Sequence, residues 1–365
     1  MSINISILAG GLSAEYEGSI SSLMNVLSKY WEYPPALRPF DIKNIYHVSR
    51  KTGDVQVIAL HENSSIVDVK RQLSGCDDLP GRPLTEVLQS AKEEYLINLL
   101  HGQFGEDGGV QALADLLKLN GTFGDPCVAA LTMNKYAMSS FVSSALPASV
   151  VKIPQMQLLR PRSSTAAVEA AKASDRPIVI KPNSLGSSLC TRLFPSPEAS
   201  KTEISGLLAT IFERDSAALV QEFIPGDDYS CGLFMVHAEP IILPVVRIEA
   251  SGNFLGYEEK KFTSKNRKVV LKDADSISLR IKSVTRSILE FVDVYATARF
   301  DFRVCPDGEI WFLECNYVPG LAEDSIFQAM LKGYGISVID MLSQLCAAAP
   351  KYNRKPHIIS LEESA

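Results

Sequence analysis

Residues 298–320 read ARFDFRVCPDGEIWFLECNYVPG. The turn-forming run Pro-Asp-Gly at 306–308 separates two apolar segments, 299–304 and 310–314. This pattern predicts two antiparallel strands joined by a tight turn. Because alternate residues of a strand share a face, pairing would gather polar side chains of both strands on one side of the hairpin.

The polar side chains on that side are suited to binding a metal ion and phosphate. Asp301, Glu314 and Asn316 offer carboxylate and amide oxygens without any His or Cys, which is the donor set that Mg²⁺ prefers. Arg299 lies two residues before Asp301, where it would neutralise charge developing on a transferred phosphoryl group or a tetrahedral oxyanion. The sequence predicts a magnesium and phosphate site here; a surface hairpin with solvated charges is the alternative.

Two segments from the middle of the chain suit a nucleotide. In PIVIKPNSLGSS, residues 177–188, Lys181 ends an apolar strand and the small residues that follow expose backbone N–H groups. The P-loop pattern GxxxxGK[ST] is absent, and an ordinary turn would have the same composition. In VQEFIPGDD, residues 220–228, a strand edge could bind adenine and a carboxylate could bind ribose. Taken alone, each segment is a weak signal.

Glycine-rich segments follow two predicted strands near the N-terminus. They are GGLSAEYEGS at residues 10–19 and LLHGQFGEDG at residues 99–108. His101 stands at the carboxyl end of its strand, where open α/β sheets bind ligands. Glu15 could pair with a substrate ammonium group; in the alternative interpretation Ser13 caps a helix whose N-terminus favours nearby acids.

The composition favours a cytoplasmic enzyme. The net charge is −6 and no basic run is present, so neither nucleic acid nor an anionic membrane is an expected partner. The N-terminus lacks the pattern of a signal peptide, and no stretch approaches the ~20 apolar residues that span a bilayer. The seven cysteines are scattered without a CxxC pair, which indicates reduced thiols.

The coarse pattern predicts three segments, 1–123, 124–224 and 225–365, with strand–loop–helix alternation in the first. The other predicted strands are 3–9, 45–48, 55–59, 95–100, 177–181 and 218–224, with β-rich sequence from 229 to 246. The predicted helices are 13–30, 110–119, 131–144, 165–173 and 274–292, and 74–83 is predicted as a loop.

The motifs, taken in order, resemble the D-alanine–D-alanine ligase family over nearly the whole chain. The runs that carry the resemblance are Gly-Gly-x-Ser-Ala-Glu, Leu-His-Gly-x-x-Gly-Glu-Asp-Gly, Leu-Thr-Met-Asn-Lys135, Lys-Pro-x-x-x-Gly-Ser-Ser and Glu-x-Asn-x-x-Pro-Gly. The implied fold is α/β and α+β. A Rossmann-like preATP-grasp domain (1–123) would precede two ATP-grasp subdomains, 124–224 and 225–365, that hold ATP between them.

The resemblance also implies roles for individual residues. Those implied to bind ATP are Lys135, Lys181, Ser187, Ser188, Gln221, Glu222, Phe223, Ile224, Asp228 and either Lys260 or Lys261. Those implied to bind two Mg²⁺ ions, with Mn²⁺ as a substitute, are Asp301, Glu314 and Asn316. Those implied to bind the amino acids or to act in catalysis are Glu15, His101, Ser187, Arg299, Gly320, Ser325 and Ile326.

The implied reaction joins two small-molecule amino acids. The first carboxylate attacks the γ-phosphate of ATP to give an acyl phosphate, and the amine of the second substrate then displaces phosphate. Because an acyl phosphate hydrolyses readily, a water-excluding lid is expected, and residues 183–190 and 252–268 are the candidates. Family members are usually homodimers, which implies a homodimer here.

The sequence departs from the family pattern mainly where the amino acids would bind. The departures are Cys190 in place of Gly, Leu185 in place of a polar residue, Gln221 in place of an acid, Ala112 in place of Gly and Phe262 in place of Tyr. Three alternatives therefore stay open. They are a relative with other amino-acid substrates in natural-product biosynthesis, a depsipeptide ligase of the D-alanine–D-lactate type, and a non-catalytic nucleotide-binding protein.

Overall fold

A computed structural model describes residues 3–62, 64–163, 165–249 and 267–348. The N-terminal region forms a five-stranded sheet in the order β3-β2-β1-β4-β5. Its strands are β1 (Ile3–Gly10), β2 (Phe40–Val48), β3 (Val55–Ala59), β4 (Tyr95–Asn98) and β5 (Asn120–Gly121). β1 runs parallel to both β2 and β4, and β3 pairs antiparallel with β2. The predicted hairpin at 45–48 and 55–59 is therefore confirmed, although β2 begins five residues earlier.

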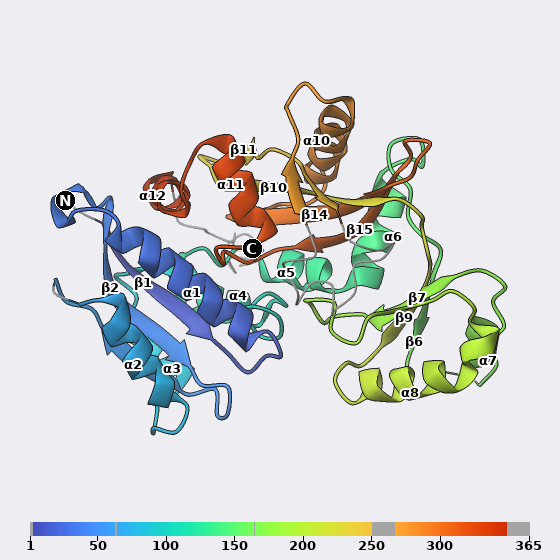
Figure 1. The fold of residues 1–365 in the computed structure, drawn as a ribbon. Helices are drawn as coiled ribbons and strands as arrows, with labels where there is room; N and C mark the ends of the chain where they lie inside the picture. Colours follow the sequence, from blue (N-terminus) through green and yellow to red (C-terminus); the bar gives the residue numbers. More distant parts are fainter. Residues whose placement is uncertain (1–2, 63, 164, 250–266, 349–365) are drawn as a thin grey trace, which may run out of the picture.

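Helices cover both faces of this sheet (Figure 1). They are α1 (Tyr16–Trp31), α2 (Ile66–Cys76), α3 (Leu84–Ser90) and α4 (Gly109–Leu117), and a 3₁₀ turn, Pro35–Leu37, precedes β2. Ile5 and Ile7 pack with α1 and α2, whereas Leu8 packs with α3 and α4. The prediction of a loop at 74–83 is wrong at its start, because α2 continues to Cys76. The signal that was missed is a capping box between Ser65 and Asp68, which fixes the N-terminus of α2.

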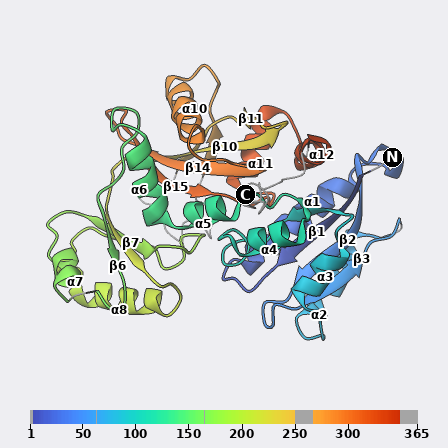
Figure 2. The ribbon, with the colours of Figure 1, turned by 180° about the vertical axis from the view of Figure 1, so that it is seen from behind.

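A smaller antiparallel sheet, in the order β6-β9-β7-β8, lies on the opposite side of the molecule in both views (Figures 1 and 2). Its strands are β6 (Met156–Leu159), β7 (Ile178–Pro182), β8 (Arg192–Phe194) and β9 (Ala218–Glu222). The helices beside it are α7 (Thr165–Lys172) and α8 (Lys201–Phe212), the latter preceded by the 3₁₀ turn Glu198–Ser200. Ile204, Leu208 and Ile211 of α8 are buried against the sheet.

Two helices, α5 (Pro126–Met133) and α6 (Lys135–Ala145), connect the N-terminal sheet to this smaller sheet. The single helix predicted for 131–144 is wrong, because Asn134 adopts an extended conformation and its side chain caps α6 by accepting the N–H of Ala137. Asn is a favoured N-cap residue, since its side-chain oxygen satisfies an N–H that the helix leaves unpaired.

The C-terminal region forms a sheet in the order β13-β12-β10-β14-β15, with β11 paired to β10. Its strands are β10 (Asp227–Val236), β11 (Glu239–Ile242), β12 (Val246–Glu249), β13 (Arg267–Val270), β14 (Thr297–Val304) and β15 (Ile310–Asn316). The helices are α10 (Ser276–Leu289), α11 (Ile326–Tyr334) and α12 (Val338–Ala348). Along β14, Phe300 and Phe302 are buried in the cluster that contains α10, and the polar residues between them face the other way.

One apolar cluster joins the first and last parts of the chain. It contains Ile5 and Leu23 from the N-terminal region together with Phe234, Phe327 and Leu342 from the C-terminal region. By contrast, the cluster under the smaller sheet consists only of residues between 159 and 220. Among the described residues, no helix is long and apolar enough to cross a membrane. The division of the chain at 123/124 and 224/225 stays a prediction.

Candidate active site

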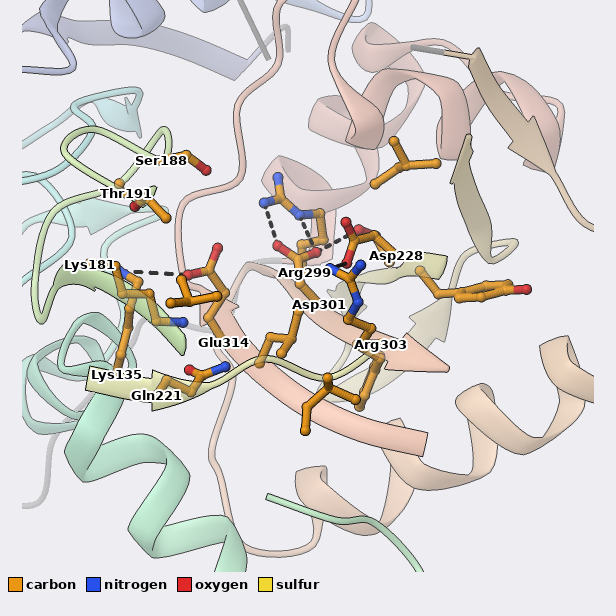
Figure 3. A pocket seen from close by; sticks show the side chains of 18 of the residues that line it. Lys135, Lys181, Ser188, Thr191, Gln221, Asp228, Arg299, Asp301, Arg303 and Glu314 are labelled. Atoms are coloured by element: carbon orange, nitrogen blue, oxygen red, sulfur yellow. Dashed lines mark hydrogen bonds and ion pairs between the residues drawn. The ribbon is translucent and has the colours of Figure 1, made fainter. Parts of the chain in front are cut away.

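The principal pocket lies between the smaller sheet and the C-terminal sheet and encloses about 910 Å³, including its open mouth. Its walls come from β7, β9 and the loop after β7 on one side, and from β10, β14 and β15 on the other. Figure 3 shows Lys135 and Lys181 on the first side and Arg299, Asp301 and Arg303 on the second. A cleft between two parts of a chain, lined by apolar and charged side chains, is where small-molecule ligands commonly bind.

The hairpin β14–β15 brings the predicted polar residues together through a shift in register between Asp301 and Phe302, which the sequence did not predict. Asp301 lies opposite Glu314, and Arg299 lies opposite Asn316. Arg299 donates two hydrogen bonds to the Asp301 carboxylate, each 2.8 Å long. Burial works against the charge of Arg299, but Asp301 outweighs it and holds the pKa of the guanidinium above its ordinary value. This arginine therefore stays charged inside the pocket.

The oxygens of Asp301 are fully engaged by protein groups. Ser230 donates to Oδ1 at 2.6 Å and Asn316 donates to Oδ2 at 3.1 Å, in addition to the two bonds from Arg299. Two carboxylates and an amide on adjacent strands fit Mg²⁺, which takes oxygen donors. Since each carboxylate oxygen already accepts two bonds, a metal ion bound by Asp301 would replace one of them. Asn316 would contribute its amide oxygen, since an Asn side chain carries an acceptor oxygen beside the nitrogen that now donates to Asp301.

Two lysines face this hairpin from the other side of the pocket. Lys135, at the start of α6, lies 3.6 Å from a Glu314 oxygen and donates to the carbonyl of Leu185 at 2.8 Å. Lys181, the residue before the last one of β7, lines the pocket and is 9% exposed. The two predicted phosphate-binding lysines are thus brought together across from Asp301 and Glu314. Lys260 and Lys261 lie outside the described residues.

β9 and the two residues after it present groups suited to a purine base. Gln221, Phe223 and Ile224 line the pocket. The N–H of Phe223 donates to the carbonyl of Pro177. The backbone N–H that could donate to a base is therefore that of Ile224. Glu222 does not line the pocket, because its carboxylate accepts the N–H of Gln155 at 2.7 Å.

Asp228, the predicted ribose-binding acid, also lines the pocket and is tied to an arginine that sequence reasoning missed. Arg303 bonds Asp228 at 3.2 Å and the carbonyl of Gly226 at 2.8 Å, and its guanidinium lies 5.0 Å from the centre of the Phe223 ring. The signal for Arg303 was present in the sequence. It follows Asp301 by two residues and therefore shares its face of β14.

The predicted site for the first amino acid lies where the loop after β7 meets α1. Ser187 donates to the Glu15 carboxylate at 2.8 Å. Glu15 lies so close to Gly186 and Gly102 that a Cβ at either position would come within 3.0 Å of a carboxylate oxygen. A side chain at Gly186 would displace the end of the Glu15 side chain, and Gly102 in addition has a φ of 68°, a conformation that favours glycine. Ser187, Ser188 and Cys190 all adopt left-handed backbone conformations, with φ between 52° and 54°.

Buried polar groups surround the remaining predicted substrate residues. Burial lowers the pKa of His101, which contacts the Ser22 hydroxyl at 3.1 Å. Ser325 caps α11 by accepting the N–H of Gln328, which leaves its own proton available to a ligand. Ile326 lines the pocket, while Gly320 lies in the loop between β15 and α11.

Glu106 is a buried carboxyl group that sequence reasoning left without a role. It accepts the N–H of Gly102 at 2.9 Å and the N–H of Val318 at 3.3 Å, so it joins the glycine-rich segment 99–108 to the loop after β15. Burial, and to a lesser extent the nearby charge of Glu15, raises the pKa of Glu106 to about 8.

The fold and the pocket together define an ATP-dependent ligase with the ATP-grasp architecture. Two family models match the chain: D-ala D-ala ligase N-terminus at residues 4–122 and D-ala D-ala ligase C-terminus at residues 149–347. The chain belongs to the D-alanine–D-alanine ligase family, as these two matches show.

Individual relatives agree with this assignment at low identity. The chain is 28% identical to a D-alanine–D-alanine ligase of Aquifex aeolicus over 81% of its own length and 94% of the relative. It is 26% identical to the vancomycin C-type resistance protein VanC2 of Enterococcus casseliflavus, covering 94% and 98% of the two chains. The VanG D-Ala:D-Ser ligase of Enterococcus faecalis matches with a TM-score of 0.74 at 25% identity, over 95% of this chain and 99% of that one.

Proposed function

We propose that this protein joins two amino acids through an acyl phosphate, consuming ATP between its smaller and C-terminal sheets. The observation that carries the proposal is that two carboxylates with an arginine face two lysines across one pocket. Asp301 and Glu314, with Arg299 beside them, lie on one wall, and Lys135 and Lys181 lie on the other. Phosphoryl transfer requires mainly positioned positive charge, and this arrangement supplies it.

Specific roles follow from the positions of the side chains. Lys135 and Lys181 would hold the phosphates, and Gln221 and the Ile224 N–H would bind the base. Asp301, Glu314 and Asn316 would hold Mg²⁺, which when bound neutralises phosphate charge. At the amino-acid end, Glu15 would bind the first ammonium group, and Arg299 with the Gly320 N–H would stabilise the oxyanion formed when the second amine attacks. A dimer and a cytoplasmic location belong to the same proposal.

The test is phosphate release from ATP, screened against pairs of D- and L-amino acids, with mass detection of the product. Turnover with at least one pair is expected, and Lys181→Ala should abolish it because a phosphate would lose its counter-charge. Failure to release phosphate with every pair would refute the proposal, and so would an unchanged rate in Lys181→Ala.

A second candidate acceptor is favoured by the relatives. VanG is a D-Ala:D-Ser ligase, so D-serine belongs among the second substrates to be tested beside D-alanine. A hydroxy acid such as D-lactate is a further acceptor. An amine must be deprotonated to attack, whereas a hydroxyl carries no such titration, so the pH dependence of product formation separates the two.

A further inference from the structure

Buried hydrogen bonds from the N-terminal region hold the loop after β15 on both sides of Gly320. The N–H of Val318 donates to Glu106 at 3.3 Å. The N–H of Leu321 donates to the Ser22 hydroxyl at 3.0 Å, and the carbonyl of Leu321 accepts from the Asn25 amide at 2.7 Å. These contacts join residues that are more than 200 positions apart in the chain.

Between Val318 and Leu321, the backbone N–H of Gly320 makes no hydrogen bond to the described residues. Pro319 has no N–H, and no group in the described parts of the chain accepts a hydrogen bond from Gly320. Buried N–H groups are nearly always paired, and Gly320 is only half-buried, so its N–H is available to a ligand. This N–H is also the one assigned above to the oxyanion.

A glycine cannot hold its own N–H in a fixed direction, because its backbone is permissive. Nothing lies within 4 Å of the position a Cβ would occupy at Gly320, so packing does not fix it either. The direction of the N–H is therefore set by the peptides on either side. On the C-terminal side, Ser22 holds the N–H of the adjacent Gly320–Leu321 peptide, and Asn25 holds the carbonyl of the peptide after it. On the N-terminal side, Glu106 holds the N–H of Val318, two peptides away.

We infer that Asn25 is a positioning residue for the Gly320 N–H, and that α1 is the element that aligns it. This inference rests on the proposed ligase function. Asn25 is 95% buried on α1, and its amide nitrogen donates to Leu321. The same helix begins next to Glu15, and Ser22 of α1 contacts His101 as well as Leu321. A single rigid helix thus connects the predicted site of the first amino acid to the oxyanion donor.

Asn25 gives a cleaner test than the other two anchors. Ser22 contacts the predicted substrate residue His101, and Glu106 is itself ionisable, so changing either has a second effect. We choose Asn25→Ala, which removes the donor, and Asn25→Asp, which keeps the shape but cannot donate. Tyr33→Phe is the matched control. The Tyr33 hydroxyl also bridges the N- and C-terminal regions, by donating to Asp340 at 3.2 Å, but it does not touch the loop.

The expected result is a loss in kcat without a loss in nucleotide binding. Removing an oxyanion donor outright costs about 10²- to 10³-fold in kcat, so displacing one should cost about 10- to 100-fold in both Asn25 variants. The KM for ATP should stay within about twofold, because the pocket is not touched. Tyr33→Phe should lower the thermal midpoint as Asn25→Ala does and leave kcat unchanged.

Equal kcat values for the Asn25 variants and Tyr33→Phe would overturn the inference. If the wild-type chain turns over no amino-acid pair, the ligase proposal fails separately, and amide hydrogen exchange then provides the test. The peptide containing Val318–Leu321 should exchange faster in Asn25→Ala than in the wild type or in Tyr33→Phe. Unchanged exchange in that peptide would show that Asn25 does not hold the loop.

Discussion

Replacing Glu106 with Gln should change how the stability of the protein depends on pH. The folded protein raises the pKa of this carboxyl group from 4.5 to about 8, first through burial and then through the charge of Glu15. Between pH 5 and 8 the unfolded chain has released the proton that the folded chain still holds. The wild type therefore loses stability as pH rises through this window and reaches a plateau above about pH 8.

The size of the effect follows from the two pKa values. The interval from 4.5 to about 8 corresponds to at most about 5 kcal/mol of unfolding free energy. Gln does not ionise, so the unfolding free energy of Glu106→Gln should not show this decrease between pH 5 and 8. At pH 5 the variant should be less stable by about 1 kcal/mol, because its amide nitrogen cannot accept the N–H of Val318. At pH 8.5 it should be the more stable protein by several kcal/mol.

Urea unfolding followed by far-ultraviolet circular dichroism, at half-unit steps from pH 5 to 8.5, would measure both curves. The curves should cross between the two extremes. Parallel curves would refute the reasoning, because they would show that Glu106 has the same proton affinity in the folded and unfolded chains. Glu86→Gln, which makes the same substitution at an exposed position in the first turn of α3, is the control and should not reproduce the crossing of the curves.

Three further outcomes are expected. Asp301→Asn should reduce kcat/KM at least about 100-fold and raise the Mg²⁺ concentration needed for half-maximal activity. The reason is that it removes a metal-binding charge and the partner of Arg299. An unaltered Mg²⁺ titration would contradict this. Ser187→Ala loses the charge-assisted hydrogen bond to Glu15, which is worth about 1.5–3 kcal/mol. We therefore expect kcat/KM to fall about 10- to 100-fold, with the KM for ATP nearly constant. An increase in the KM for ATP alone would argue against a role of this bond at the amino-acid site. Cys190→Gly should be about 1 kcal/mol more stable to thermal unfolding than Cys190→Ala, because φ at this position is 52°. Glycine is usually the less stable of the two replacements. If it were so here, the result would count against a left-handed conformation at Cys190.

Much of the secondary structure was predictable from local sequence patterns. The hairpin β14–β15 was predictable because two apolar segments flank a Pro-Asp-Gly turn. The pairing of Asp301 with Glu314 also depends on a register shift between Asp301 and Phe302, which no local pattern marks. The break between α5 and α6 was missed because apolar periodicity continues across Asn134, while the cap depends on one side-chain bond. The interpretation of 74–83 as loop failed for a similar reason, since turn-forming residues there hide the last turn of α2.

Contacts between distant parts of the chain could not be predicted in this way. The bond from Val318 to Glu106 spans 212 positions, and no local pattern marks Glu106 as a residue that would meet the loop after β15. The left-handed conformation of Cys190 is a partial exception. The family pattern has glycine at this position, and the structure shows the backbone conformation for which glycine is suited.

The separation of the apolar clusters has a mechanical consequence. The first and last parts of the chain share one buried core, whereas the smaller sheet keeps a core of its own. Opening the nucleotide cleft by swinging the smaller sheet away exposes little apolar surface, while separating the other two parts would split a core. We therefore expect the smaller sheet to be the part that moves, and the bond from Ser187 to Glu15 to break when the cleft opens.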